Sequence, residues 1–261
     1  MIKLNSKNFQ KTKDFLEEKY EKYNHIDFIE NDPIQIPHRF TKKQDIEISA
    51  LFAAVLAWGL RKTIINKCNL IMELMGNSPH DFILNHKASD LNNVGFQEFK
   101  HRTFNSTDFL YFIDFLQRFY QKNDSLEILF SSKETQKENI AHFHNTFFDI
   151  DYAPQRTKKH ISTPERKSAC KRLNMYLRWL VRKDDKGVDF GIWENISPSI
   201  LICPLDIHVE RESKKLGLLE RNISDWKAAE ELTQNLRLFD ATDPVKYDFA
   251  LFGLGVENKK R

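Results

Sequence analysis

Apolar residues recur every three or four positions over most of the chain, and no stretch keeps a two-residue alternation for long. Apolar residues three or four positions apart lie on one side of a helix, which can then pack on a core. A two-residue alternation would instead indicate strands. The pattern therefore predicts an all-α protein. Its helices are expected at residues 9–23, 46–58, 64–75, 106–120, 139–150, 168–182, 206–216, 224–236 (beginning at Ser224 or Asp225) and 244–254.

The segment 46–58 is apolar on nearly every side (IEISALFAAVLAW), which is typical of a helix buried at the centre of a domain. Thr41 and Gln44 precede it with the spacing of a capping box, so we expect their side chains to cap its start. Gly59 and Gly76 are expected to end this helix and the next, and the two helices to form a hairpin.

Asp206 lies where an apolar segment, stiffened by Pro204, meets a helical pattern that runs to Leu216. Aspartate is a preferred residue at a helix N-cap, and Gly217 stands where a helix-ending glycine is expected. The local pattern favours a plain cap. It leaves open a cap that has a second, chemical role.

The last predicted helix contains an acid in apolar surroundings. Asp243 is expected to cap it and Pro244 to begin it, while Gly253 and Gly255 are expected to end it. Asp248 falls inside this helix among aromatic residues, so we expect its carboxylate to be partly buried and to need partners.

The segment 168–182 combines a packing stripe of leucines with a second stripe of mostly basic residues. The second stripe consists of Lys171, Met175, Arg178 and Arg182, at spacings of four, three and four. Such a cationic face suits a phosphate backbone. Taken alone, Lys171 is most simply a solvated or phosphate-facing lysine.

The composition permits several functions and excludes few. With 41% hydrophobic and 12% aromatic residues, the 261-residue chain can form a sizeable core, as one domain or as two closely packed lobes. Only 8 glycines and 8 prolines are present, which disfavours a sandwich or barrel with many tight turns. A net charge of +3 permits nucleic-acid binding without requiring it.

The three cysteines, Cys68, Cys170 and Cys203, lack the spacing of a metal site. We expect them to be reduced thiols that pack as small hydrophobic groups, and we expect neither a metal nor a cofactor. The first fifteen residues contain no apolar signal segment, and no run has membrane-spanning length. A cytoplasmic protein without a membrane partner is therefore expected.

The run KRLNMYL at 171–177, followed by CPLDIHVERESKKLGLL at 203–219, resembles the helix-hairpin-helix superfamily of base-excision DNA glycosylases. The archaeal 8-oxoguanine DNA glycosylase branch is the most similar, through its K-x-L-N and P-x-D-x-x-V patterns. Its later D-x-x-x-W pattern is similar to Asp248 and Phe252 in this chain. The segments SACKRLN, CPLD and DPVKYDFALFGLG also resemble an uncharacterised bacterial protein family along most of the chain.

This resemblance implies a single glycosylase-like unit over residues 1–261, with two helical lobes around a cleft. The central lobe would cover approximately 61–200, and the N-terminal and C-terminal helices would form the other. The implied activity is a DNA glycosylase, with or without AP-lyase activity, acting on an 8-oxoguanine-like purine. Its implied partner is double-stranded DNA with a damaged base, and the protein would be a nucleoid-associated monomer.

The resemblance also implies residue roles. Lys171 would attack C1′ of a nucleotide flipped out of the duplex, and Asp206 would stabilise the cationic sugar and assist proton transfer. The flipped base would be bound by Asp248, Phe252 and Met175.

Contacts with DNA phosphates are implied for four basic residues: Lys167, Arg172, Arg178 and His208. For His208, the local pattern slightly favours a plain surface position. Two further functions stay open. One is a helix-hairpin-helix DNA-binding protein without catalysis, which the glycine-free hairpin ISTPERKSAC at 161–170 favours. The other is an RNA- or protein-binding helical scaffold in which Lys171 and Asp206 form an ion pair.

Overall fold

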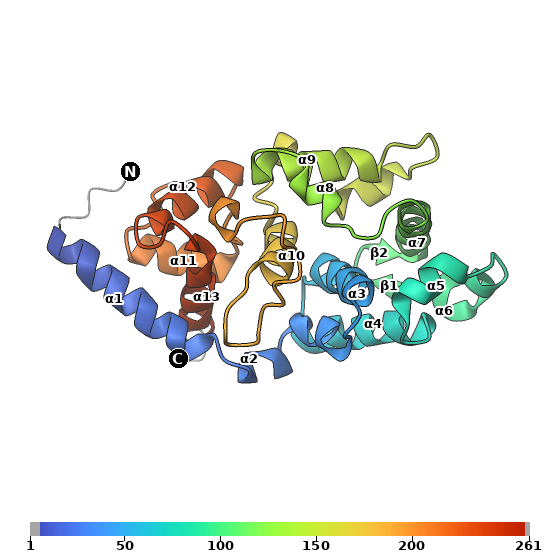
Figure 1. The fold of residues 1–261 in the computed structure, drawn as a ribbon, viewed down its shortest axis with the longest axis horizontal. Coiled ribbons are helices and arrows are strands. Elements are labelled where there is room, and N and C mark those ends of the chain that lie inside the picture. Colours follow the sequence, from blue (N-terminus) through green and yellow to red (C-terminus); the bar gives the residue numbers. More distant parts are fainter. Residues whose placement is uncertain (1–5, 259–261) are drawn as a thin grey trace. The chain divides into compact units, whose positions relative to one another are not determined.

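A computed structural model describes residues 6–258, with side chains from Asn8 onward, so the first five residues of the N-terminal segment considered above lie outside it. The described chain is mostly helical (Figure 1). Its only named strands are two short ones, β1 (Lys100–His101) and β2 (Phe104–Asn105), which pair antiparallel. The all-α prediction is confirmed. None of the helices between residues 6 and 258 is long and apolar enough to cross a membrane.

The chain divides into two compact units. The first unit contains Met1–Glu30, Glu134–Glu138 and Thr163–Arg261, and the second contains Asn31–Lys133 and Asn139–Ser162. The central lobe predicted at approximately 61–200 differs from the second unit at both ends. The second unit begins earlier because the short 3₁₀ helices after residue 32 pack on the first central helix, and it ends before the helix that carries Lys171.

The second unit is built around a buried helix with an aromatic neighbour. In chain order it contains η1 (Pro33–Gln35), η2 (Pro37–Arg39), α3 (Lys43–Leu56), α4 (Arg61–Leu74), α5 (Pro79–Asn85), η3 (Asp90–Asn92), α6 (Val94–Gln97), α7 (Ser106–Tyr120), α8 (Ile128–Ser131), most of α9 (Gln136–Phe147) and η4 (Gln155–Lys159). Every residue of α3 from Ile46 onward is buried, as predicted. Phe52 of α3 packs edge-on against Phe109 of α7, with ring centroids 5.6 Å apart.

The predicted capping box before α3 is wrong. The N-cap of α3 is Lys42, and no side chain makes a capping hydrogen bond there. Gln44 instead donates through Nε2 to the carbonyl of Asp124, at 3.0 Å. The Gln44 side chain therefore bonds to a residue far away in the sequence rather than to the start of its own helix.

The first unit draws its helices from both ends of the chain (Figure 1). It contains α1 (Ser6–Tyr23), α2 (Asp27–Glu30), η5 (Pro164–Arg166), α10 (Lys171–Val181), η6 (Pro198–Ile200), α11 (Ile207–Lys215), α12 (Trp226–Arg237), η7 (Pro244–Lys246) and α13 (Tyr247–Glu257). The apolar α13 packs against both α1 and α11. It thereby joins the N-terminal helix to the helix that Asp206 begins.

Gly253 and Gly255 lie inside α13, so the prediction that they end the last helix is wrong. A Cβ on Gly253 would lie 2.3 Å from Cγ of Tyr23, and one on Gly255 would lie 2.6 Å from Cβ of His208. Both separations are shorter than real Cβ atoms show. Glycine at these positions therefore lets α1 and α11 pack closely against α13.

The two predicted aspartate caps have different outcomes. Asp206 is the N-cap of α11, and Gly217 follows its last turn with a φ of +68°, as predicted. Asp243 precedes η7 but makes no capping hydrogen bond. Its carboxylate instead accepts from Nε of Arg182, at 2.8 Å, because a buried cation is within reach.

Candidate functional site

A tight turn without glycine leads into α10. Lys167 and Cys170 adopt left-handed backbone conformations, with φ values of +61° and +49°. Each such conformation costs an L-residue roughly 1–2 kcal/mol, so the turn needs fixed neighbours. They are present: the Cys170 amide donates to Oγ of Ser168 (3.1 Å), and Ser168 forms an isolated antiparallel bridge with Asp225. Lys167 is exposed in this turn.

Lys171 and Asp206 each lie at the start of a helix. Lys171 is the first residue of α10 and is half-buried. Asp206 is also half-buried, and its Oδ1 accepts hydrogen bonds from the backbone amides of His208 (2.8 Å) and Val209 (2.9 Å). The positive end of the α11 dipole favours a negative charge at this position.

Asp248 connects the charged groups of the site. It is only 5% exposed and pairs with Nη1 of Arg178. Burial raises the pKa of Asp248 to about 6; the Arg178 charge opposes this shift, the Asp206 charge adds to it, and the Lys171 charge also opposes it. Lys171 and Asp206 therefore both lie within electrostatic range of the Asp248 carboxylate. We call these four residues the Lys171 site.

The Cys203 thiol borders the Lys171 site and donates a weak hydrogen bond to Asp248. Its Sγ lies 4.0 Å from Oδ1 of Asp248. Burial raises the pKa of the Cys203 thiol, and the neighbouring carboxylates of Asp248 and Asp206 raise it further. A protonated thiol is a poor nucleophile. All three cysteines are buried and free, which confirms the prediction that they pack as small hydrophobic groups.

Two of the predicted base-binding residues flank this site. Phe252 lies one turn after Asp248 on α13 and is half-buried, with its ring edge-on to His208 (6.0 Å between centroids) and to Phe28 (6.1 Å). Met175 lies one turn after Lys171 on α10 and is also half-buried. An apolar side chain thus follows each of two charged residues by one helical turn: Phe252 follows Asp248, and Met175 follows Lys171.

Arg178 is not a surface cation, so its assignment to DNA phosphate is wrong. Its side chain is 4% exposed and forms ion pairs with Asp189 (3.3 Å) and Asp248. Its guanidinium also lies over the ring of Phe249, 4.1 Å from the centroid. Arg182, on the same predicted stripe, is 1% exposed. The C-terminal half of α10 therefore faces acids inside the protein.

The other predicted phosphate contacts are more accessible. Lys167 is exposed, whereas Arg172 and His208 are half-buried. Burial lowers the pKa of Arg172 to about 10. His208 lies within hydrogen-bond distance of the Gly255 carbonyl through Nδ1 (3.0 Å), so in this pose Nδ1 carries the proton and Nε2 is the nitrogen that remains for a ligand.

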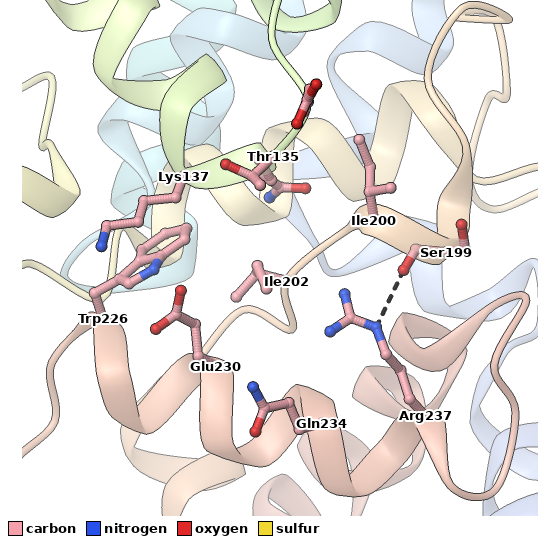
Figure 2. Close-up of a pocket in the computed structure, with 11 residues that line it drawn as sticks. Thr135, Lys137, Ser199, Ile200, Ile202, Trp226, Glu230, Gln234 and Arg237 are labelled. Atoms are coloured by element: carbon pink, nitrogen blue, oxygen red, sulfur yellow. Dashed lines mark hydrogen bonds between the residues drawn. The ribbon is translucent and has the colours of Figure 1, made fainter.

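The sequence did not predict a second site in the first unit, a cavity of about 320 Å³. It is lined by the start of α9, residues 199–202 and one face of α12, and Figure 2 shows Arg237 at one side of it and Trp226 at the other. A signal was present in the sequence: Trp226, Glu230 and Arg237 follow one another at spacings of four and seven, which places them on one helix face.

The chain belongs to a family described as proteins of unknown function (DUF2400), whose model matches residues 32–257. Neither the curated proteins nor the solved structures gave a match to this chain. The family model covers both the Lys171 site and the cavity.

Proposed function

We propose that this protein is a base-excision DNA glycosylase with a helix-hairpin-helix, two-lobed architecture, acting on an oxidised purine in double-stranded DNA. The observation that supports it most is the Lys171 site. A lysine that begins a helix after a tight turn, and an aspartate that caps a second helix, both lie within electrostatic range of one buried carboxylate.

In the proposed first step, Lys171 acts as the nucleophile. Its Nζ must first give up a proton, for which Asp206 is the proposed acceptor. The Nζ lone pair then forms a bond to C1′ of the flipped nucleotide. The electron pair of the glycosidic bond leaves with the base, which takes up the proton that Asp206 received from Nζ. As this proton leaves, the Asp206 carboxylate stabilises the positive charge that develops on the sugar, and it accepts hydrogen bonds from the His208 and Val209 amides of α11.

The proposed second step is strand cleavage. Opening of the sugar ring converts the C1′ adduct into a protonated Schiff base between Lys171 and C1′. Loss of a proton from C2′ then expels the 3′ phosphate by β-elimination. Water finally hydrolyses the imine and releases the lysine.

The remaining residues have binding and positioning roles in this proposal. Phe252 and Met175 contact the flipped base, and Asp248 accepts a hydrogen bond from it. Arg178 is a positioning residue, because its ion pairs with Asp248 and Asp189 fix the carboxylate. Lys167, Arg172 and Nε2 of His208 are the proposed phosphate contacts.

Borohydride trapping tests the lysine. The protein is mixed with duplexes that contain 8-oxoguanine or an abasic site, and sodium borohydride reduces any Schiff base to a stable secondary amine. We expect a covalent protein–DNA adduct with the natural sequence and none with Lys171→Gln. Lys227→Gln is the matched control, since Lys227 is exposed and lies on α12 outside the Lys171 site.

The proposal fails if neither duplex gives an adduct, or if the Lys171→Gln variant is trapped as efficiently as the natural protein. Circular dichroism of the variants at equal concentration separates a chemical defect from a folding defect.

A DNA-binding protein of the same architecture without catalysis is the second candidate. It is favoured by one observation: both acids near Lys171 already have protein partners, Asp206 in the α11 amides and Asp248 in Arg178. This candidate predicts salt-dependent duplex binding with no trapped adduct on either lesion.

A further inference from the structure

The cavity beside α12 has unpaired charges of both signs. Glu230 and Arg237 line it from the same helix, and neither belongs to an ion pair among residues 6–258. Glu230 is nevertheless close enough to act on the charge of Arg237. In Figure 2, Glu230 lies beside Trp226 while Arg237 lies beside Ser199, with Ile202 between them.

Arg237 is held in position from behind. Its Nε donates to the Ser199 carbonyl (3.2 Å) and its Nη2 to the Leu201 carbonyl (3.4 Å). Burial lowers the pKa of Arg237, while Glu230 opposes the shift. Two neutral acceptors fix the guanidinium, and Glu230 acts on its charge without lying within ion-pair distance. An oxyanion in the cavity would compensate that charge.

Two residues that line the cavity, Trp226 and Gln136, each have a buried polar atom that lacks a partner. Nε1 of Trp226 is an unpaired donor, and Oε1 of Gln136 is an unpaired acceptor; each residue is 3% exposed. The Gln136 amide is fixed because its Nε2 donates to Oδ1 of Asn174 (2.6 Å).

The separation of the charges limits the occupant's shape. Glu230 and Arg237 are seven residues apart on α12, which is a rise of about 10 Å along the helix. The apolar side chains of Ile200 and Ile202 between the charges suit a ring. Lys137 and Glu134 add one further charge of each sign to the lining.

We propose that this cavity binds a nucleoside monophosphate, with the phosphate at Arg237 and the exocyclic amino group of the base at Glu230. The Trp226 side chain lines the cavity next to Glu230. None of these residues belongs to the Lys171 site, so this binding goes beyond the proposed glycosylase activity and does not depend on it.

The indole signals in a ¹H–¹⁵N spectrum test the proposal. The chain has four tryptophans, and Nε1 of both Trp226 and Trp58 is buried without a partner. Only Trp226 lines the cavity, so Trp58 is an internal control. On titration with adenosine 5′-monophosphate we expect a saturable shift of the Trp226 indole signal and no shift for Trp58.

Partial ligands test the two ends separately. Adenosine lacks the phosphate, and purine riboside 5′-monophosphate lacks the amino group. Each should bind at least about 10-fold more weakly than adenosine 5′-monophosphate, because each leaves one charged side chain unpaired. Inorganic phosphate alone should give a much smaller shift of the Trp226 signal.

Two variants complete the test. Arg237→Lys keeps the charge but removes the planar fork, and Glu230→Gln breaks no hydrogen bond recorded among residues 6–258. Both should weaken binding about 10-fold or more, and Lys227→Ala, exposed on the same helix, should leave it unchanged. If Arg237→Lys fails to fold, Glu230→Gln alone decides.

Three results would overturn the proposal. They are an unmoved Trp226 signal at millimolar nucleotide, equal shifts of Trp58 and Trp226, and equal binding of inorganic phosphate and the nucleotide. The borohydride result does not affect this outcome, because trapping depends on Lys171 and not on the cavity.

Discussion

The two ends of α10 carry basic residues in opposite surroundings. At its first turn, Lys171 and Arg172 are half-buried, and no carboxylate is recorded within ion-pair distance of Lys171 among residues 6–258. At its last turn and just beyond it, Arg178 and Arg182 are 4% and 1% exposed and hold several carboxylates. One helix face therefore changes from a candidate reactive surface to a structural network within about three turns.

The buried end shows what a paired cation requires. Burial lowers the pKa of Arg182, but the carboxylates of Asp189 and Asp243 more than offset this, so the pKa is raised overall. Its guanidinium contacts Asp184 (2.9 Å), Asp189 (2.9 Å) and Asp243 (2.8 Å). Such a residue is expected to contribute to stability rather than to ligand binding. The predictions below test this division, from the largest effect to the smallest.

Removal of Arg182 should have the largest effect on stability. Arg182→Met leaves three carboxylates without their common partner, and breaking a buried ion pair costs about 3–5 kcal/mol. Urea unfolding monitored by circular dichroism measures the decrease. Lys183→Met, the adjacent exposed position, should change the free energy of unfolding by less than about 0.5 kcal/mol. Equal effects of the two variants would contradict the division of α10.

Asp248 should make stability depend on pH between 4 and 6. Its folded pKa of about 6 lies above the ordinary value of 3.8, so in this range the folded protein keeps a proton that the unfolded chain has released. The contribution of Asp248 to stability is therefore greatest below pH 4 and falls as pH rises to 6, by up to about 3 kcal/mol.

Asp248→Asn isolates this contribution. The free energy of unfolding of the natural protein minus that of the variant should decrease by about 3 kcal/mol between pH 4 and pH 7. Urea titrations across that range measure the difference. A difference that does not change with pH would show that Asp248 is ionised throughout.

Asp206 has a cap role and a proposed chemical role, and two substitutions separate them. Asp206→Ala should cost about 1 kcal/mol of stability, whereas Asp206→Asn, also a good N-cap, should cost only a few tenths. Both should reduce borohydride trapping if the carboxylate assists the lysine. Full trapping by Asp206→Asn would leave Asp206 as a cap alone.

Lys167 should give the smallest effect, visible only in the salt dependence of DNA binding. Lys167→Asn removes one charge and keeps a residue that tolerates the left-handed conformation. The slope of log affinity against log salt should decrease in magnitude by about 0.9 for each DNA phosphate that the variant no longer neutralises. Fluorescence anisotropy at several salt concentrations measures it. An unchanged slope would remove Lys167 from the DNA-binding surface.

Periodicity predicted the helices well where burial and helix repeat coincide. The predicted range 106–120 is that of α7, and Ile46–Leu56 of α3 is buried as expected. The cap and end of α11, Asp206 and Gly217, were also predictable, because their hydrogen bonds are local in sequence.

Periodicity failed where a distant partner changed a residue's role. Arg178 looked like a surface cation because its acids, Asp189 and Asp248, lie 11 and 70 residues away. Gly253 and Gly255 looked like helix ends, but the reason for glycine there is Tyr23 and His208 on other helices.

The sequence by itself determined that this chain is helical, where most helices lie, and that Asp206 begins one of them. These features depend on backbone hydrogen bonds and side-chain spacing over a few residues. Only the tertiary structure decided which charges are structural and which remain accessible. A buried charge is stable only beside its partner, and the partners of Asp248 and Arg182 come from distant parts of the chain.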